Sequence, residues 1–184
     1  MKLGLISAIL GDLSFEEMID FLAECGLECV EVACWPKGKA ERRYAGVSHI
    51  DVDTLDDEKC AHILDYCQKK GVEISSLAYY PNTMDPDVEK RTAYIEHLHK
   101  LIDASAKLGV NMITTFIGRD PKKTVSQNLE LVKEIWPPIL DHAKEKGVKV
   151  AIENCPMLFT EDEWPGGQNL MTTPAIWRQV FEIL

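Results

Sequence analysis

The chain has 184 residues, of which 46% are hydrophobic and 27% charged. This length predicts a single domain, residues 1–184, with a sizeable core, and the composition excludes a disordered or fibrous protein. Twenty Lys and Arg against 30 Asp and Glu give a net charge of −10, which disfavours nucleic acid and anionic membranes as partners. Apolar stretches fall short of the roughly 18 residues that a membrane helix needs.

The cysteines and the N-terminus indicate a cytoplasmic protein. The chain begins without the charged segment and long apolar stretch of a secretory signal. None of the six cysteines forms a CxxC pair, and most lie in periodic apolar segments. We therefore expect buried free thiols, in preference to disulfides or a zinc site.

One pattern recurs four times: a helical stretch ends in glycine, and a short apolar or β-branched run follows at once. The glycines are Gly26, Gly71, Gly109 and Gly147, spaced by 45, 38 and 38 residues. Glycine suits the position after a helix because a positive φ costs little without a Cβ. Together with the N-terminal run, the pattern predicts strands near 3–7, 28–33, 72–78, 111–117 and 148–153.

The segments between these strands have helical periodicity and begin at capping residues. We expect helix starts at Ser14 with Glu17 as a capping box, at Asp56 or Asp57, at Asp87, at Thr124, and at Thr173 before Pro174. Pro137 and Pro138 are expected to kink or restart the fourth helix near Trp136, because proline cannot donate a helical hydrogen bond.

Five β-α units in succession predict an α/β fold with a parallel sheet in the order 1-2-3-4-5. A doubly wound sheet and a (β/α)8 TIM barrel both fit. A repeat near 38 residues without a GxGxxG motif favours the barrel. A closed barrel needs eight such units and roughly 200 residues or more. We therefore expect the N-terminal part of a barrel, truncated within or after the fifth helix.

Active sites of such barrels lie at the carboxyl ends of the strands. The fifth predicted strand ends in Glu153, a carboxylate that closes an apolar run. Burying an ionised carboxylate requires a cation or several hydrogen-bond donors. A hard divalent metal and an ion pair with Lys or Arg are both consistent with this pattern.

Other strand ends carry aromatic and polar residues. Trp35, Tyr79 and Tyr80 are candidates to pack against a sugar, or else against the barrel rim. Asn82 and Arg119 are candidate hydroxyl or phosphate contacts, and for Arg119 we favour an ion pair with Asp120 or a Glu on the surface. The glycines after Trp164 fit either a lid over the site or a static loop. The substrate-binding candidates are Trp35, Tyr79, Tyr80, Asn82 and Trp164.

The strings VKVAIENCP and EDEWPGGQNLMTTPAIW resemble the fifth strand and following loop of the xylose-isomerase-like barrel superfamily, and GLECVEV and TTFIGRD are similar to its earlier strands. This superfamily includes sugar and sugar-phosphate isomerases and epimerases, and endonuclease IV. The resemblance implies that Glu153 is both a catalytic residue and a metal ligand. The other family ligands, an Asp, a His and a Glu on strands 6 to 8, are absent from this chain. The sequence does not distinguish Mn, Mg, Co and Zn.

The chemistry implied by the resemblance is proton transfer beside a carbonyl through an enediolate, between two metal-bound carboxylates of which Glu153 is one. We therefore expect a metal-dependent sugar or sugar-phosphate isomerase or epimerase. A truncated or degenerate non-catalytic barrel is the alternative. An apurinic endonuclease is less favoured, because the ends of strands 2 and 3, EVACWP and SLAYYPN, lack its histidines. Unpaired edges at strands 1 and 5 predict a homo-oligomer.

Overall fold

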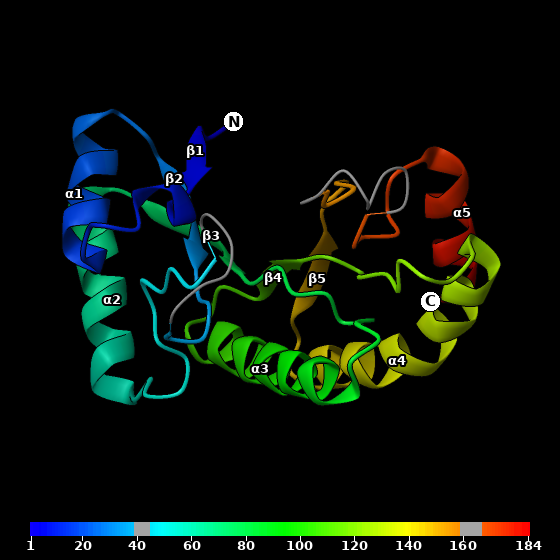
Figure 1. The fold of residues 1–184 in the computed structure, drawn as a ribbon. Coiled ribbons are helices and arrows are strands. Elements are labelled where there is room, and N and C mark those ends of the chain that lie inside the picture. Colours follow the sequence, from blue (N-terminus) through cyan, green and yellow to red (C-terminus); the bar gives the residue numbers. More distant parts are fainter. Residues whose placement is uncertain (39–44, 159–166) are drawn as a thin grey trace. The chain divides into compact units, whose positions relative to one another are not determined.

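The computed structural model describes residues 1–38, 45–158 and 167–184. Strands and helices alternate along the chain (Figure 1): β1 Gly4–Ile6, the 3-10 helix η1 Ser7–Leu10, α1 Phe15–Glu24, β2 Cys29–Ala33, α2 Asp57–Lys70, β3 Glu73–Ala78, α3 Val88–Lys107, β4 Met112–Thr115, α4 Val125–Glu145, β5 Lys149–Ile152 and α5 Pro174–Ile183. The sheet has five strands in the order β1-β2-β3-β4-β5. This order confirms part of a (β/α) barrel and excludes a doubly wound sheet with β1 at its centre.

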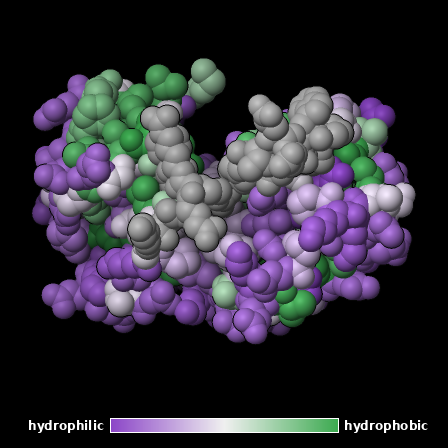
Figure 2. Space-filling view, viewed as in Figure 1, coloured by the Kyte–Doolittle hydropathy of each residue, from purple (hydrophilic) through white to green (hydrophobic). Residues whose placement is uncertain are grey.

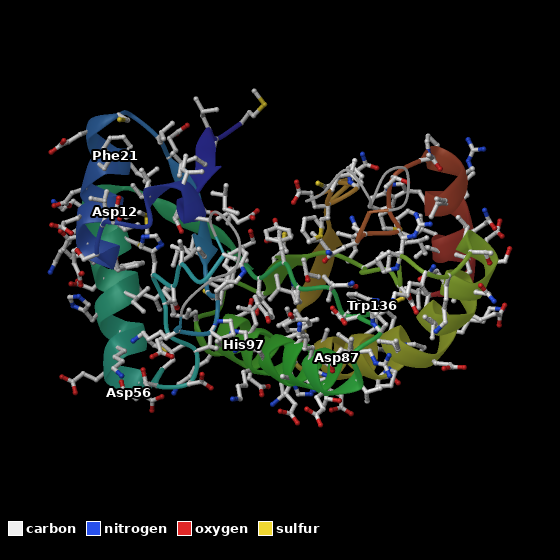
Figure 3. The ribbon with its side chains drawn as sticks, viewed as in Figure 1. Asp12, Phe21, Asp56, Asp87, His97 and Trp136 are labelled. Atoms are coloured by element: carbon white, nitrogen blue, oxygen red, sulfur yellow. The ribbon has the colours of Figure 1, made fainter. Side chains whose placement is uncertain are left out.

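The ends of the helices follow the sequence pattern closely. Gly26, Gly71, Gly109 and Gly147 all have φ between 68° and 71°, the left-handed conformation predicted for each. The predicted starts are also confirmed, and Asp56 and Asp87 can be seen at the beginnings of α2 and α3 (Figure 3). Side-chain oxygens accept backbone hydrogen bonds at Ser14, Asp56, Asp87, Thr124 and Thr173. These local signals set where each strand begins and ends.

The predicted restart of the fourth helix is wrong, because α4 runs without a break through Pro137 and Pro138. The neighbouring Trp136 and Ile139 are fully buried. The Trp136 indole also donates a hydrogen bond to the carbonyl of Ile117 over 2.9 Å. Packing on both sides of the prolines thus outweighs the two helical hydrogen bonds that they remove.

The described residues divide into two compact units. The first contains Met1–Tyr79 and Lys100–Ile113. In it, β2 pairs in parallel with both β1 and β3, and α1 lies beside α2 (Figure 1). Helix α1 buries Met18, Ile19 and Leu22 completely. All strands before β4 and the loop after β2 therefore belong to this unit.

The second unit contains Tyr80–His99 and Thr114–Leu184. In it, α4 packs against both α5 and β5. Its core includes Val132, Trp136 and Ile139 of α4 and Val180 of α5. Glu153 and the residues that hold its backbone all lie in this unit.

Polar and charged side chains cover much of the visible surface, and hydrophobic ones gather over the N-terminal part of the chain (Figure 2). Leu3, Ile9 and Phe21 are exposed in that part. Helix α5 carries another exposed apolar group, in which the rings of Trp177 and Phe181 lie 5.4 Å apart and Phe181 is 71% exposed. None of the helices described is long and apolar enough to cross a membrane.

The capping box of α4 gives a first prediction. Replacing Thr124 by Ala removes the hydroxyl that accepts the Gln127 amide at 3.3 Å. We expect the free energy of unfolding to fall by about 1 kcal/mol, as measured by urea denaturation. Thr124→Ser keeps an acceptor in place and should lose much less. Equal losses in the two variants would contradict a capping role.

Candidate functional site

Each strand is followed at once by a residue with a candidate role, at the end where barrel enzymes carry their active sites. Ser7 follows β1, Trp35 lies two residues after β2, Tyr79 follows β3, Phe116 follows β4 and Glu153 follows β5. Ser7, Trp35 and Tyr79 lie in the first unit, and Phe116 and Glu153 lie in the second.

Glu153 presents an exposed carboxylate from a firmly held backbone. Its N–H donates to the carbonyl of Thr115 at 3.0 Å, so pairing with β4 continues past the end of β5. Its own carbonyl accepts from the Asn169 amide at 3.1 Å, and Asn169 is completely buried. The adjacent Asn154 accepts from the indole of Trp177 at 2.9 Å. A carboxylate on such a backbone is suited to act at a fixed position.

Asn169 and Trp177 are positioning residues that the sequence reading missed. The Asn169 amide also donates to the carbonyl of Cys155 at 2.6 Å. It thus connects the backbone carbonyls on either side of Asn154. Both residues stand in the string QNLMTTPAIW. Their hydrogen-bond partners, Glu153 to Cys155, lie 14 to 23 residues earlier in the chain, and no local pattern identifies them.

The aromatic candidates pack in two separate pairs. In the first unit, Trp35 and Tyr79 meet edge to face with ring centroids 5.9 Å apart. Tyr79 is buried and Trp35 half-buried, so Trp35 is the member that can reach a ligand. In the second unit, Tyr80 lies against Phe116 with centroids 4.7 Å apart. Both arrangements are usual for aromatic packing, and substrate contact by these residues stays a prediction.

Asn82 makes hydrogen bonds with the backbone that follows β4. Its side-chain oxygen accepts from the N–H groups of Arg119 at 2.8 Å and Met84 at 3.2 Å. Its amide donates to the carbonyl of Arg119 at 2.8 Å. The residue is 4% exposed. These contacts explain its burial without a ligand, and its predicted contact with substrate hydroxyls remains untested.

Gly118 lies within this same group of contacts. Its φ is 83°, and a Cβ there would come within 2.8 Å of the backbone nitrogens of Thr83 and Met84. The neighbouring carbonyl of Ile117 accepts from the Thr83 hydroxyl at 2.7 Å and from the Trp136 indole. The segment after β4 is therefore fixed by side chains from α4 and from the loop after β3.

Asp120 and Arg119 are the charged residues at the end of this segment. The carboxylate of Asp120 pairs with Lys123 at 3.3 Å, and the expected pairing of Arg119 stays a prediction. Burial lowers the pKa of the Arg119 guanidinium, which nevertheless stays protonated at neutral pH. In the first unit, the Ser76 hydroxyl donates to Glu31 at 3.4 Å.

The histidines and cysteines form no metal site in the described part of the chain. His97 is buried, and His99 stacks on His142 with ring centroids 4.9 Å apart. All six cysteines are free thiols, as predicted, and Cys25 is exposed. No group of three or more His, Cys, Asp or Glu side chains could hold a metal ion within residues 1–38, 45–158 and 167–184. Glu153 alone does not fit a divalent cation. Trp164 and most of the predicted lid lie outside the described residues.

Comparison with known proteins places this arrangement in a family. Residues 19–181 match the family described as xylose isomerase-like TIM barrel. The chain belongs to the xylose isomerase-like TIM barrel family. No curated protein matches the chain at a significant level.

Solved structures with the same fold support this assignment. The probable 3-DHS dehydratase AsbF from Bacillus anthracis superposes with a TM-score of 0.71 at 19% identity, over 100% of this chain and 59% of AsbF. D-psicose 3-epimerase from Clostridium cellulolyticum H10 superposes with a TM-score of 0.62 at 17% identity, over 98% of this chain and 60% of the epimerase. D-allulose 3-epimerase from Methylomonas sp. superposes with a TM-score of 0.63 at 18% identity, over 100% of this chain and 59% of that epimerase. The chain thus spans about three fifths of the length of these xylose isomerase-like proteins.

The surroundings of Gly118 give a second prediction. Gly118→Ala introduces a Cβ against backbone atoms at a positive φ, whereas Gly147→Ala has a positive φ and open space. We expect Gly147→Ala to lower the free energy of unfolding by about 1–2 kcal/mol, and Gly118→Ala to lower it by more. Denaturant titration of both variants measures the difference. Equal losses would show that the space around Gly118 is unimportant.

Proposed function

We propose that this chain forms part of a sugar or sugar-phosphate isomerase or epimerase in which Glu153 moves a proton at a carbon next to a carbonyl. The supporting observation is the exposed Glu153 carboxylate directly after β5, on a backbone held by Thr115 and Asn169. Two solved structures with this fold are named as 3-epimerases of ketohexoses. The dehydratase AsbF shares the fold, so fold alone does not select the reaction.

The proposed step begins when the Glu153 carboxylate takes a proton from the carbon beside the carbonyl. The C–H electron pair forms the enediolate, and the carbonyl oxygen takes up the negative charge. Return of a proton to the opposite face of the same carbon gives an epimer. Its return to the adjacent carbon gives an isomer, provided that the hydroxyl on the first carbon passes its proton to the former carbonyl oxygen. Epimerisation needs a second acid on the opposite face of the substrate.

Other candidates supply binding surfaces in this proposal. Trp35 with Tyr79, and Tyr80 with Phe116, offer flat apolar faces of the kind that pack on the C–H side of sugars. Asn82 and Trp164 remain candidate hydroxyl and lid contacts. The metal implied by the family resemblance would need ligands in addition to Glu153, so no step is assigned to it here.

Glu153 gives the central activity prediction. In a chain that completes the eight β-α units, Glu153→Gln should lower kcat by about 10²- to 10⁴-fold, because the amide cannot accept the proton. The assay follows epimerisation of ketohexoses and their phosphates, and incorporation of solvent deuterium at the reacting carbon. Glu130→Gln on the exposed face of α4 is the control. Full activity and isotope exchange in Glu153→Gln would disprove the proposal. Exchange without net epimerisation would show that Glu153 is the second acid and that another group abstracts the proton.

Metal binding should distinguish the 184-residue chain from a complete barrel. A single carboxylate competes poorly with water for a divalent ion, so we expect a Kd for Mn²⁺ on the order of 1 mM or weaker in the 184-residue chain. Calorimetric titration should show tight binding in the completed barrel and its loss in Glu153→Gln. Tight, stoichiometric binding by the monomeric 184-residue chain would contradict this ligand assignment.

We also propose that the 184-residue chain self-associates through its apolar ends. In the described sheet β1 and β5 are the outermost strands, and Leu3 and Phe181 are 68% and 71% exposed. Leu3→Lys with Phe181→Lys should shift sedimentation toward the monomer, because a charge beside β1 disfavours edge pairing and a charge on α5 interrupts its exposed apolar surface. Val88→Lys removes another hydrophobic side chain, which is 60% exposed at the start of α3, and should leave association unchanged. A monomeric parent chain would refute the proposal.

A further inference from the structure

A histidine in the loop after β2 joins three segments of the first unit. His49 Nδ1 lies 3.0 Å from the Ser7 hydroxyl, directly after β1. Its Nε2 lies 3.3 Å from the carbonyl of Leu10 in η1. Its backbone N–H donates to the carbonyl of Ala33 at the end of β2, over 2.9 Å. One residue thus connects β1, η1 and β2.

The partners determine which nitrogen of His49 carries the proton. The Leu10 carbonyl can only accept, so Nε2 must be protonated and donate. The Ser7 oxygen already accepts the backbone N–H of Ala33 at 2.8 Å. Its hydroxyl hydrogen is free to point at Nδ1, which accepts in the neutral ring. Ser7 is completely buried, so this hydrogen has little access to water. The neutral ring is the form that gives the Ser7 hydroxyl hydrogen an acceptor, so the arrangement favours neutral imidazole.

The same loop holds Trp35. The N–H of Trp35 donates to the carbonyl of Val47 at 3.1 Å. Cys34 and Ser48 form an antiparallel bridge between these hydrogen bonds. Val47–His49 therefore pairs with 33–35 as a short ribbon. On the 33–35 side, the N–H of Ala33 donates to Ser7 and the N–H of Cys34 donates to the carbonyl of Ala78. On the 47–49 side, the His49 side chain links the ribbon to Ser7 and to Leu10 of η1. The Trp35 ring lies against Tyr79 at its other side.

We propose that neutral His49 is a positioning residue that holds Trp35 in its substrate-facing orientation, and that protonation of His49 releases this ribbon. The link to catalysis rests on the proposed function, because it assumes that Trp35 contacts the sugar. The positioning of Trp35 by His49 does not depend on that assumption. A protonated ring would place a hydrogen on Nδ1, so the Ser7 hydroxyl would lose its acceptor within a buried site.

The surroundings of His49 favour the neutral form. Burial lowers the pKa of His49 below its ordinary value of 6.5, and the carbonyls of Leu10 and Leu13 oppose this shift. On the β1 and η1 side its contacts are the Ser7 hydroxyl and these carbonyls, and on the β2 side the backbone of Ala33. Among the described residues of its own loop, the charged groups include Asp51 and Lys37, which pair with each other at 2.9 Å, and Asp53, which pairs with Lys100.

The sign of the pH effect follows from the lowered pKa. The unfolded chain binds a proton more readily than the folded one, so stability from this contact is complete above about pH 6.5. This contribution to stability falls as the pH drops from 6.5 through the lower pKa that His49 has in the folded state. Trp35 should therefore be held at neutral pH and released under mild acid.

The test follows Trp35 directly by ¹⁹F NMR of 5-fluorotryptophan-labelled protein, with its resonance assigned through Trp35→Phe. We expect this resonance to shift with pH, with a midpoint below 6.5. His49→Gln keeps a donor and an acceptor, so its Trp35 resonance should stay near the neutral position across the titration. His49→Ala should give a displaced resonance at every pH. His62→Gln, an exposed histidine on α2, should titrate like the parent.

The outcomes separate this inference from the proposed function. A Trp35 resonance that is unaffected by pH, or that titrates equally in His49→Gln, overturns the inference whatever the enzyme activity. If the resonance behaves as expected but no sugar is turned over, the positioning role stands and the proposed reaction fails. In an active barrel, His49→Ala should raise KM several-fold with a smaller effect on kcat, and His49→Gln should restore KM.

Discussion

Backbone groups that leave the end of a strand can no longer pair with the next strand, and in the interior each must find another partner. This chain supplies those partners from buried polar side chains. Ser7 binds the N–H of Ala33 at the end of β2, Asn82 binds both backbone groups of Arg119 after β4, and Asn169 binds the carbonyl of Glu153 after β5. All three are at most 4% exposed. The candidate site therefore depends on buried side chains that hydrogen-bond to the backbone.

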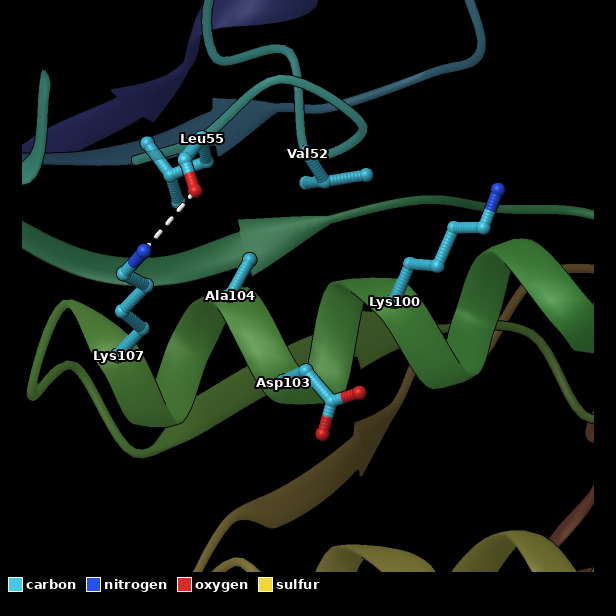
Figure 4. A pocket seen from close by; sticks show the side chains of 6 residues that line it. All are labelled: Val52, Leu55, Lys100, Asp103, Ala104 and Lys107. Carbon is cyan, nitrogen blue, oxygen red and sulfur yellow. Dashed lines mark hydrogen bonds between the residues drawn. The ribbon is translucent and has the colours of Figure 1, made fainter. Parts of the chain in front are cut away.

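The same hydrogen bonds fix the backbone at the strand ends that carry the candidate site residues. A catalytic group must be held close to its productive geometry by neighbours whose own conformations are fixed. Glu153 meets this condition because β4, Asn169 and the Asn154–Trp177 contact hold the backbone on either side of it. By contrast, the lysines that border a pocket beside α3 already have partners. This pocket is lined by Val52, Leu55, Lys100, Asp103, Ala104 and Lys107. Lys107 donates to the carbonyl of Leu55 (Figure 4), and Lys100 pairs with Asp53.

The sequence predicted what local chemistry determines. Helix caps such as Ser14 and Thr124, and glycines such as Gly71, act within a few residues, so their patterns located the strands and helices. Contacts over longer separations were beyond such reasoning. The place of Asn82 after a strand predicts a hydroxyl contact, but no local pattern identifies its hydrogen bonds with Arg119, 37 residues away. The restart at Pro137 failed for the same reason, since the burial of Trp136 depends on Ile117 across the unit.

Near the strand ends, residue type distinguishes polar side chains that hold the backbone from those that are exposed to solvent. Asn82, Asn128 and Asn169 are buried amides; Asn82 and Asn128 both donate to and accept from backbone, and Asn169 donates to two carbonyls. A carboxylate in these places would face a carbonyl oxygen and be repelled, so an amide is required for structure alone. Glu153 is the opposite case: its backbone is satisfied by others and its carboxylate is exposed. Its exposure at a strand end leaves the carboxylate accessible, as the proposed proton transfer requires, and an amide could not carry out that transfer.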